Sequence, residues 1–206
     1  MSLKCFVKVG SINNLSDARY CSGMNVDHVG FLMEENNINS IDITNLREIS
    51  NWISGVKIVG EFNNSSIKFI NSKLNQFPFD FLQVTYPLSI KKINFDKSKI
   101  ILNIPSLGNV YFKNFLDNFI ENYSEISIIN ISVLSNLTNT FVNHNLFLSN
   151  KKFKLLNGFN HSKSYLKKMI NKKKFYGVSL TGNNEIKPGY KDYTDLTEVF
   201  EFLEKD

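Results

Sequence analysis

Two ionisable residues, Lys8 and Glu61, each lie within a short apolar run that has the composition of a buried β-strand. Lys8 precedes Gly10 by two residues, so the alternation of side chains along a strand places these two positions on the same face. A lysine and a carboxylate in contact can exchange a proton, which is the requirement for acid–base catalysis. They can equally form a buried ion pair or contact a helix, and the sequence leaves these roles open.

Amides and hydroxyls form a second group of candidates, because they recur near the carboxyl ends of the predicted strands. The residues of this group are Ser11, Asn63, Gln83, Thr85, Asn103, Asn130, Asn157, Ser179 and Thr181. If the strands form a parallel barrel, these ends meet at one mouth, and the side chains line a common pocket. Such a pocket suits a polyhydroxylated or phosphorylated ligand. Asparagine fills about one position in seven of the chain, so no single asparagine is informative by itself.

Residues that bind metals or form disulfides are few and scattered. The three histidines, His28, His144 and His161, lie in different segments, and the two cysteines are Cys5 and Cys21. We therefore expect no metal site, no cofactor and no disulfide framework, in keeping with a reducing compartment. The sequence contains no apolar run of roughly 18 residues and no signal-peptide pattern at its start, so we expect a cytoplasmic protein without a membrane segment.

The formal net charge of +5 is modest for 206 residues, of which 21% are charged. Lysines concentrate in two late segments, 151–154 and 167–174. A nucleic-acid surface would interleave aromatic residues with the basic ones or carry a binding motif, and neither is present. We interpret these lysines as solvated positions on a helix and its last turn, where they complement the helix dipole, and we expect no nucleic-acid partner.

Short β-rich runs recur about every 25 residues and alternate with helical patterns. The runs are residues 5–9, 27–32, 56–61, 79–84, 99–103, 126–131, 153–157 and 175–180. Eight strand–helix units in a chain with 42% apolar residues predict an α/β protein, specifically a single-domain (β/α)8 TIM barrel spanning residues 1–206. An open doubly wound sheet is the alternative, but its glycine-rich first turn is missing, because the first turn here reads GSINNL.

The helices are predicted with different clarity. Asn14 can cap the first helix and Gly23 can close it. The second helix, residues 42–52, has an apolar stripe that includes Trp52. Helical spacing also marks residues 110–122, 162–171 and 195–204, whereas residues 86–98 and 133–150 give no clear pattern.

Segments near the two ends of the chain carry a resemblance to a known family. Residues 8–18 read KVGSINNLSDA, and residues 177–192 read GVSLTGNNEIKPGYKD. Phosphoribosylanthranilate isomerases begin with Lys-Ile-Cys-Gly followed by Asn-Leu-x-Asp-Ala, and end with Gly-Val-Asp-Val-Ser-Ser-Gly followed by Pro-Gly-x-Lys-Asp. Shorter matches occur at residues 30–33, 47–49 and 59–64. The chain therefore resembles this family, whose barrel catalyses an aldose–ketose (Amadori) isomerisation in tryptophan biosynthesis.

The resemblance places the family's catalytic residues on positions that cannot do the same chemistry. The family's cysteine base aligns with Gly10, and its aspartic acid aligns with Asn130. Its substrate-binding arginine and its strand-four histidine fall at Asn39 and Thr85. Since one general acid or base contributes about a hundredfold to ten-thousandfold, the resemblance implies a catalytically degenerate barrel, a pseudoenzyme. Lys8 and Glu61 remain the only candidates for a different acid–base pair.

The family's phosphate site, in contrast, depends mainly on backbone N–H groups after strands seven and eight. The corresponding residues here are Asn157, Gly158, Thr181, Gly182 and Asn183. The resemblance thus implies a phosphate-binding site, although the glycines can also serve only to permit tight turns.

Three functions follow from the sequence. The first is a degenerate isomerase-like barrel, monomeric or homodimeric, that binds a small phosphorylated or polyhydroxylated molecule. The second is an active phosphoribosylanthranilate isomerase or another sugar-phosphate isomerase. The third is a non-catalytic interaction or scaffold barrel.

Overall fold

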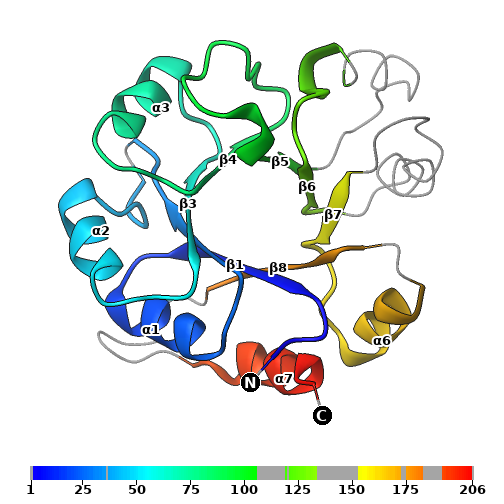
Figure 1. Cartoon of the computed structure of the whole chain (residues 1–206). Helices are drawn as coiled ribbons and strands as arrows, with labels where there is room; N and C mark the ends of the chain where they lie inside the picture. Colours follow the sequence, from blue (N-terminus) through cyan, green and yellow to red (C-terminus); the bar gives the residue numbers. More distant parts are fainter. Residues whose placement is uncertain are drawn as a thin grey trace.

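A computed structural model describes residues 2–35, 37–105, 119, 121–133, 153–172, 175–182 and 192–205. Its centre is a closed barrel in which each strand pairs in parallel with the next and β8 pairs with β1 (Figure 1). The strands are β1 (Phe6–Ile12), β2 (His28–Leu32), β3 (Lys57–Phe62), β4 (Phe81–Thr85), β5 (Ile100–Ile104), β6 (Ile128–Ile131), β7 (Lys154–Asn157) and β8 (Gly177–Thr181). The predicted (β/α)8 barrel is therefore confirmed.

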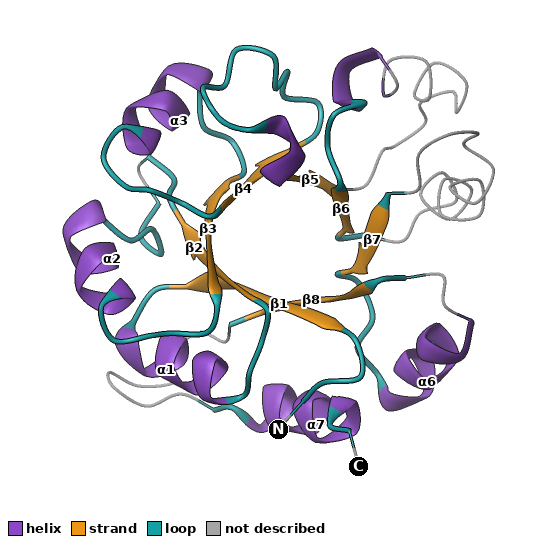
Figure 2. Ribbon diagram, viewed as in Figure 1, coloured by secondary structure: helices purple, strands orange, loops and turns teal. Residues whose placement is uncertain are grey.

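Helices surround the strands and bury their apolar faces against the outside of the barrel (Figure 2). The described helices are α1 (Leu15–Gly23), α2 (Ile43–Ser50), α3 (Ile67–Leu74), α6 (Lys163–Lys172) and α7 (Thr194–Leu203), with a short 3₁₀ helix η1 (Lys97–Lys99) before β5. Asn14 caps α1 as predicted, because its side chain accepts a hydrogen bond from Asp17 N at 2.9 Å. Asp42 caps α2 in the same way through Asn45 N at 2.8 Å.

Apolar residues form two cores, one on each side of the barrel wall. The outer core lies between strands and helices and includes Val7, Val9, Leu46 and Phe200. The inner core is small and consists of Val59, Ile101, Ile128 and Leu156, with Phe6 and Phe81 packed against it. The remainder of the barrel interior is polar, as described below.

The two ends of the chain close the ring of helices. Leu3 forms an antiparallel bridge with Glu204, and Lys4 N donates to Leu203 O at 2.7 Å. At the opposite end of these helices, Tyr193 Oη donates to the buried carboxylate of Asp17 at 2.6 Å, which links the start of α7 to the start of α1. These contacts hold the last strand–helix unit against the first.

Two helix predictions are wrong in detail. Trp52 does not continue the apolar stripe of α2, because the helix ends at Ser50 and the following turn leaves Trp52 67% exposed. Gly23 is the last residue of α1 but does not supply the left-handed residue that ends it, since that conformation belongs to Asn25, with φ of 53°. Most of the predicted helix 110–122 and of the unclear segment 133–150 lies outside the described residues.

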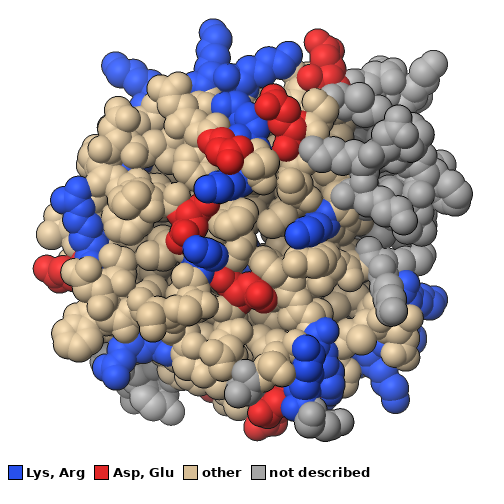
Figure 3. All heavy atoms as spheres, viewed as in Figure 1, with Lys and Arg blue, Asp and Glu red and all other residues tan. Residues whose placement is uncertain are grey.

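Figures 1 to 3 view the barrel along its axis, and the strand order runs clockwise in Figure 1. Right-handed crossovers require this order when a barrel is seen from the amino ends of its strands. On this face, acidic and basic side chains are interspersed around the axis (Figure 3). Lys57, the first residue of β3, and Asp80, just before β4, form an ion pair at 3.1 Å at the amino ends of their strands.

Within the part of the chain that the structure describes, no helix is long and apolar enough to cross a membrane.

Candidate ligand site at the mouth of the barrel

The inward-facing residues of the barrel form layers, each built from alternate strands. The observed register places Gly30, Gln83, Asn130 and Ser179 in one layer, from β2, β4, β6 and β8. Above it, at the carboxyl ends of the odd strands, lie Gly10, Glu61, Asn103 and Gly158, and below it lie Lys8, Val59, Ile101 and Leu156. The candidate site is thus the upper, polar half of the barrel interior.

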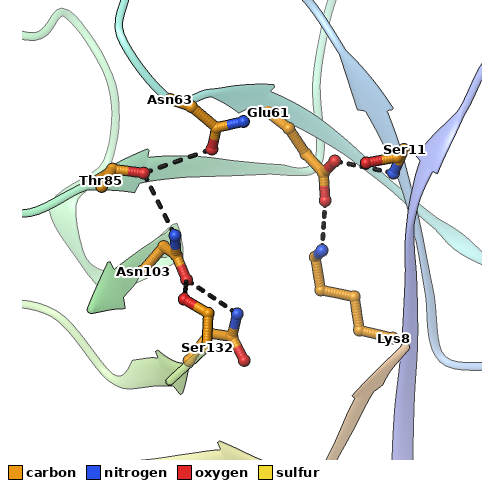
Figure 4. Close-up of polar contacts among 8 residues, drawn as sticks. Lys8, Ser11, Glu61, Asn63, Thr85, Asn103 and Ser132 are labelled. Atoms are coloured by element: carbon orange, nitrogen blue, oxygen red, sulfur yellow. Dashed lines mark hydrogen bonds and ion pairs between the residues drawn. The ribbon is translucent and has the colours of Figure 1, made fainter. Parts of the chain in front are cut away.

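The structure brings Lys8 and Glu61 together as a buried ion pair. Lys8 Nζ donates to Glu61 Oε1, and the two side chains are 2% and 4% exposed (Figure 4). The other carboxylate oxygen, Oε2, accepts a hydrogen bond from Ser11 N at 2.9 Å. Both oxygens of the carboxylate therefore have donors, which a charge removed from water requires.

Two glycines make room for this pair. A Cβ added at Gly10 would lie 2.9 Å from Lys8 Nζ, and one added at Gly30 would lie 2.6 Å from Glu61 Cδ. Glu61 thus fills the space that side chains from β1 and β2 would otherwise occupy. This role of Gly30 was not identified from the sequence.

The backbone of β1 also adapts to the carboxylate. The register with β2 shifts between Val9 and Ile12, so β1 contains a bulge at this point. Within it, Ser11 adopts a left-handed conformation with φ of 56°, which costs about 1 kcal/mol for a residue with a Cβ. The bulge directs Ser11 N–H toward Glu61, and that hydrogen bond offsets the strain.

Amide and hydroxyl side chains from β3 to β6 form a chain of hydrogen bonds across the mouth (Figure 4). Asn130 Nδ2 donates to Asn103 Oδ1 at 2.9 Å, and Asn103 Nδ2 donates to Thr85 Oγ1 at 3.3 Å. Thr85 Oγ1 donates in turn to Asn63 Oδ1 at 3.3 Å. Ser132 adds a second donor to Asn103 Oδ1 at 2.6 Å. The predicted pocket-lining residue Asn103 therefore contacts both Thr85 and Asn130, and the sequence analysis missed Ser132.

Among the described residues, three buried side-chain atoms have no hydrogen-bond partner: His28 Nδ1, Gln83 Oε1 and Asn130 Oδ1. His28 packs between the rings of Phe6 and Phe81, with ring centroids 4.7 and 4.3 Å away. Burial, together with the nearby Lys8 ammonium, lowers the pKa of His28 to about 4, so the ring is neutral at pH 7. It lies at the amino end of β2, away from the mouth.

The loops after β7 and β8 use several of their polar groups internally. The Asn157 side chain donates to Asn160 O at 2.6 Å and accepts from the N–H groups of Phe159 and Asn160 at 3.2 Å. The N–H groups of Gly158 and Gly182 donate to Ile131 O and Gly10 O, at 2.9 and 2.8 Å.

Thr181, at the end of β8, is exposed, and Ser179 is buried in the layer below the mouth. Asn183 lies outside the described residues. Of the residues predicted to bind phosphate, Thr181 therefore offers a side chain at the mouth.

Glu34, in the loop after β2, orders the loop after β3. Its carboxylate accepts hydrogen bonds from Asn63 N, from Asn64 N at 2.9 Å and from Ser65 Oγ at 2.9 Å. The contact with Glu34 thereby fixes the backbone of Asn63, whose side chain accepts the hydrogen bond from Thr85. The sequence offered no signal for it, since 31 residues separate Glu34 from Ser65.

Hollows away from the mouth are less suited to a specific ligand. One of about 500 Å³ lies at the amino end of the barrel and is lined in part by Cys5, Asp27 and Tyr176. Burial raises the pKa of Cys5 to about 11, so its thiol is not a nucleophile at pH 7. Among the described residues, no group of histidine, cysteine and carboxylate side chains is placed to hold a metal ion.

Comparison with known proteins gives similarity at the level of structure. No protein-family model and no curated protein sequence matches the chain. A monomeric form of the dimeric phosphoribosylanthranilate isomerase from Thermotoga maritima superposes with a TM-score of 0.70 and 19% identity, covering 97% of this chain and 98% of that one. The isomerase from Pyrococcus furiosus gives 0.69 and 14% with the same coverage.

A further similar structure is a phosphoribosylanthranilate isomerase in complex with reduced 1-(o-carboxyphenylamino)-1-deoxyribulose 5-phosphate. It has a TM-score of 0.68 and 20% identity, and it covers 97% of this chain and 98% of its own. These neighbours match over nearly the whole length of both chains, which confirms, for the fold, the resemblance carried by the terminal segments. The chain has the barrel fold of the phosphoribosylanthranilate isomerases.

Proposed function

We propose that this protein is a phosphoribosylanthranilate isomerase-like barrel that has lost the parent reaction and binds a small polyhydroxylated or phosphorylated molecule at its mouth. The observation that carries the proposal is the composition of the upper interior, where amides and hydroxyls surround the ion pair of Lys8 and Glu61. An Amadori rearrangement needs one group that protonates the sugar ring oxygen and another that removes a proton. Gly10 has no side chain, and Asn130 is a neutral amide engaged with Asn103.

Phosphate recognition in this proposal depends on the ends of β7 and β8. The N–H groups of Gly158 and Gly182 already donate hydrogen bonds within the barrel wall. We therefore expect an anion to be bound by the Thr181 hydroxyl and by residues that follow it in the sequence, including Asn183. A hydroxyl on such an edge donates to phosphate oxygens without adding a charge. The site is therefore expected to bind phosphate more weakly than one built from free N–H groups.

The first experiment measures both binding and turnover. The probe for binding is reduced 1-(o-carboxyphenylamino)-1-deoxyribulose 5-phosphate, the ligand of the similar isomerase, titrated by calorimetry. We expect binding without turnover of phosphoribosylanthranilate generated in situ. The variant Thr181→Val should weaken the probe about fivefold to tenfold by removing one hydrogen bond, and Thr44→Val, an exposed threonine on α2, is the matched control.

Absence of any binding would refute the proposal and leave the scaffold function. Turnover above the enzyme-free rate would refute the loss of activity.

A second candidate function, acid–base catalysis by Lys8 and Glu61, has one specific observation in its favour. The Glu61 carboxylate occupies the space beside Gly10, where a Cβ would lie 3.1 Å from Glu61 Cδ. A carboxylate supplied from β3 thus stands where a side chain from β1 would project.

Any measured turnover would test this candidate. Glu61→Gln should then lower kcat at least about a hundredfold, whereas unchanged turnover would exclude Glu61 as the catalytic base.

A further inference from the structure

The layer just below the mouth contains two amide oxygens that lack donors, Gln83 Oε1 and Asn130 Oδ1. Both residues are 6% exposed, and both point inward from β4 and β6 in the same layer. More than about 90% of buried polar groups in proteins have a hydrogen-bond partner, so two orphan oxygens in one layer call for an explanation. An amide oxygen accepts only, which means that whatever completes this layer must donate.

The hydrogen-bond chain of the mouth fixes the orientation of the Asn130 amide. Its Nδ2 donates to Asn103 Oδ1, so turning the amide over would set two oxygens against each other. The oxygen of Asn130 must therefore face away from Asn103. Because its N–H group is already donating, cooperative polarisation makes this oxygen a better acceptor than a free amide.

The charge of the interior decides what kind of donor fits. Lys8 and Glu61 neutralise one another beside this layer, so the described inward-facing residues leave no unpaired charge for a ligand ion. An ammonium group placed here would be an uncompensated charge in a medium of low dielectric, and a phosphate would face oxygens that only accept. A hydroxyl group donates without either cost.

We propose that Gln83 Oε1 and Asn130 Oδ1 receive hydrogen bonds from hydroxyl groups of a neutral polyol chain that enters through the mouth. This inference rests on the proposed function, because it identifies the part of the proposed ligand that Gln83 and Asn130 contact. Specificity would then lie in the polyol chain, since a site with buried acceptors discriminates strongly against a ligand that leaves them unpaired.

The test uses three probes, ribitol, ribose 5-phosphate and inorganic phosphate, titrated into the wild type and two variants. Gln83→Met keeps the length of the side chain and removes the acceptor, and Asn130→Leu removes the other. Gln76→Met, on an exposed glutamine after α3, is the matched control. Each interior variant should raise the Kd for ribitol and for ribose 5-phosphate about fivefold to tenfold and leave inorganic phosphate unchanged.

The outcomes separate this inference from the proposed function. Equal binding of ribose 5-phosphate by the wild type and a folded Gln83→Met variant would overturn the polyol contact and leave ligand binding at the mouth intact. Binding of inorganic phosphate as tightly as ribose 5-phosphate, with none of ribitol, would overturn it as well and would mean that water alone fills the layer. Binding of none of the probes by the wild type would overturn both proposals.

Discussion

The buried pair of Lys8 and Glu61 predicts that two substitutions together are less harmful than either alone. Lys8→Met leaves the carboxylate without its cation, and Glu61→Leu leaves the ammonium without its anion, each at 4% side-chain exposure or less. Breaking such a pair from one side costs about 3–5 kcal/mol, because the remaining charge is buried and uncompensated. Glu61→Leu also removes the acceptor of Ser11 N, which adds about 1–3 kcal/mol.

The double variant Lys8→Met/Glu61→Leu removes both charges. Replacing a whole buried pair by apolar residues of similar volume is often neutral or stabilising by about 1–4 kcal/mol. Only the unpaired Ser11 N–H then remains as a cost, so the double variant should lose at most about 1–3 kcal/mol. We therefore expect the double variant to be more stable than both single variants.

Urea unfolding followed by far-UV circular dichroism measures these differences. Trp52, the single tryptophan, is a poor fluorescence reporter because it is 67% exposed in the folded protein. The control pair is Lys163 and Glu198, 3.4 Å apart with side chains 60% and 58% exposed, where each substitution should change the free energy of unfolding by about 0–1 kcal/mol. A double variant as unstable as the sum of the two singles would refute the argument that the charges stabilise each other.

Three further predictions concern neighbouring features. Gly10→Cys places a Cβ 2.9 Å from Lys8 Nζ and should lower the free energy of unfolding by about 1–3 kcal/mol in urea, but by less in the double variant that lacks the pair. His28 has a folded pKa of about 4 against an ordinary value of 6.5, so the unfolded chain binds a proton that the folded chain does not, and stability falls as the pH drops from 6.5 toward 4. The loss at pH 4 reaches about 3 kcal/mol, and His28→Gln should remove it from a stability–pH curve; an unchanged curve would contradict the burial argument. Tyr193→Phe deletes the 2.6 Å hydrogen bond to the Asp17 carboxylate and should cost about 1.5–3 kcal/mol by the same unfolding assay, whereas no loss would mean that the bond does not join α7 to α1.

The fold was predictable because its determinants are local. A strand such as β2 is buried along its whole length, so its sequence is predominantly apolar and can be recognised as a strand. The first helix, α1, is capped by the side chain of Asn14, a residue type that favours this position. The errors are local too. Trp52 has the spacing of the α2 stripe, yet the helix ends two residues earlier, and periodicity alone does not show where a helix stops.

The site was predictable only in part, because its contacts join residues that are distant in the sequence. The positions of Gln83, Thr85 and Asn103 at strand ends followed from strand parity, which is again a local property. The ion pair of Lys8 and Glu61 was one of several roles that the sequence left open, because 53 residues separate the two and strand parity shows which way a side chain points but not how far it reaches. Nor could the bulge at Ser11 be foreseen, because serine gives no signal for a left-handed conformation.

The geometry around Gly10 bears on the proposal that this barrel does not carry out the isomerase reaction. Glu61 can occupy its present place only if neither β1 nor β2 projects a side chain there, which both Gly10 and Gly30 ensure. Conversely, a chain with glycine at both positions and no Glu61 would leave a void beside a buried ammonium. The conformations of Glu61 and Lys8 therefore depend on glycine at positions 10 and 30. A substitution that places a side chain at position 10 must displace the Glu61 carboxylate. A cysteine therefore cannot be introduced at position 10 as a base by itself, because Lys8 and Glu61 must change with it.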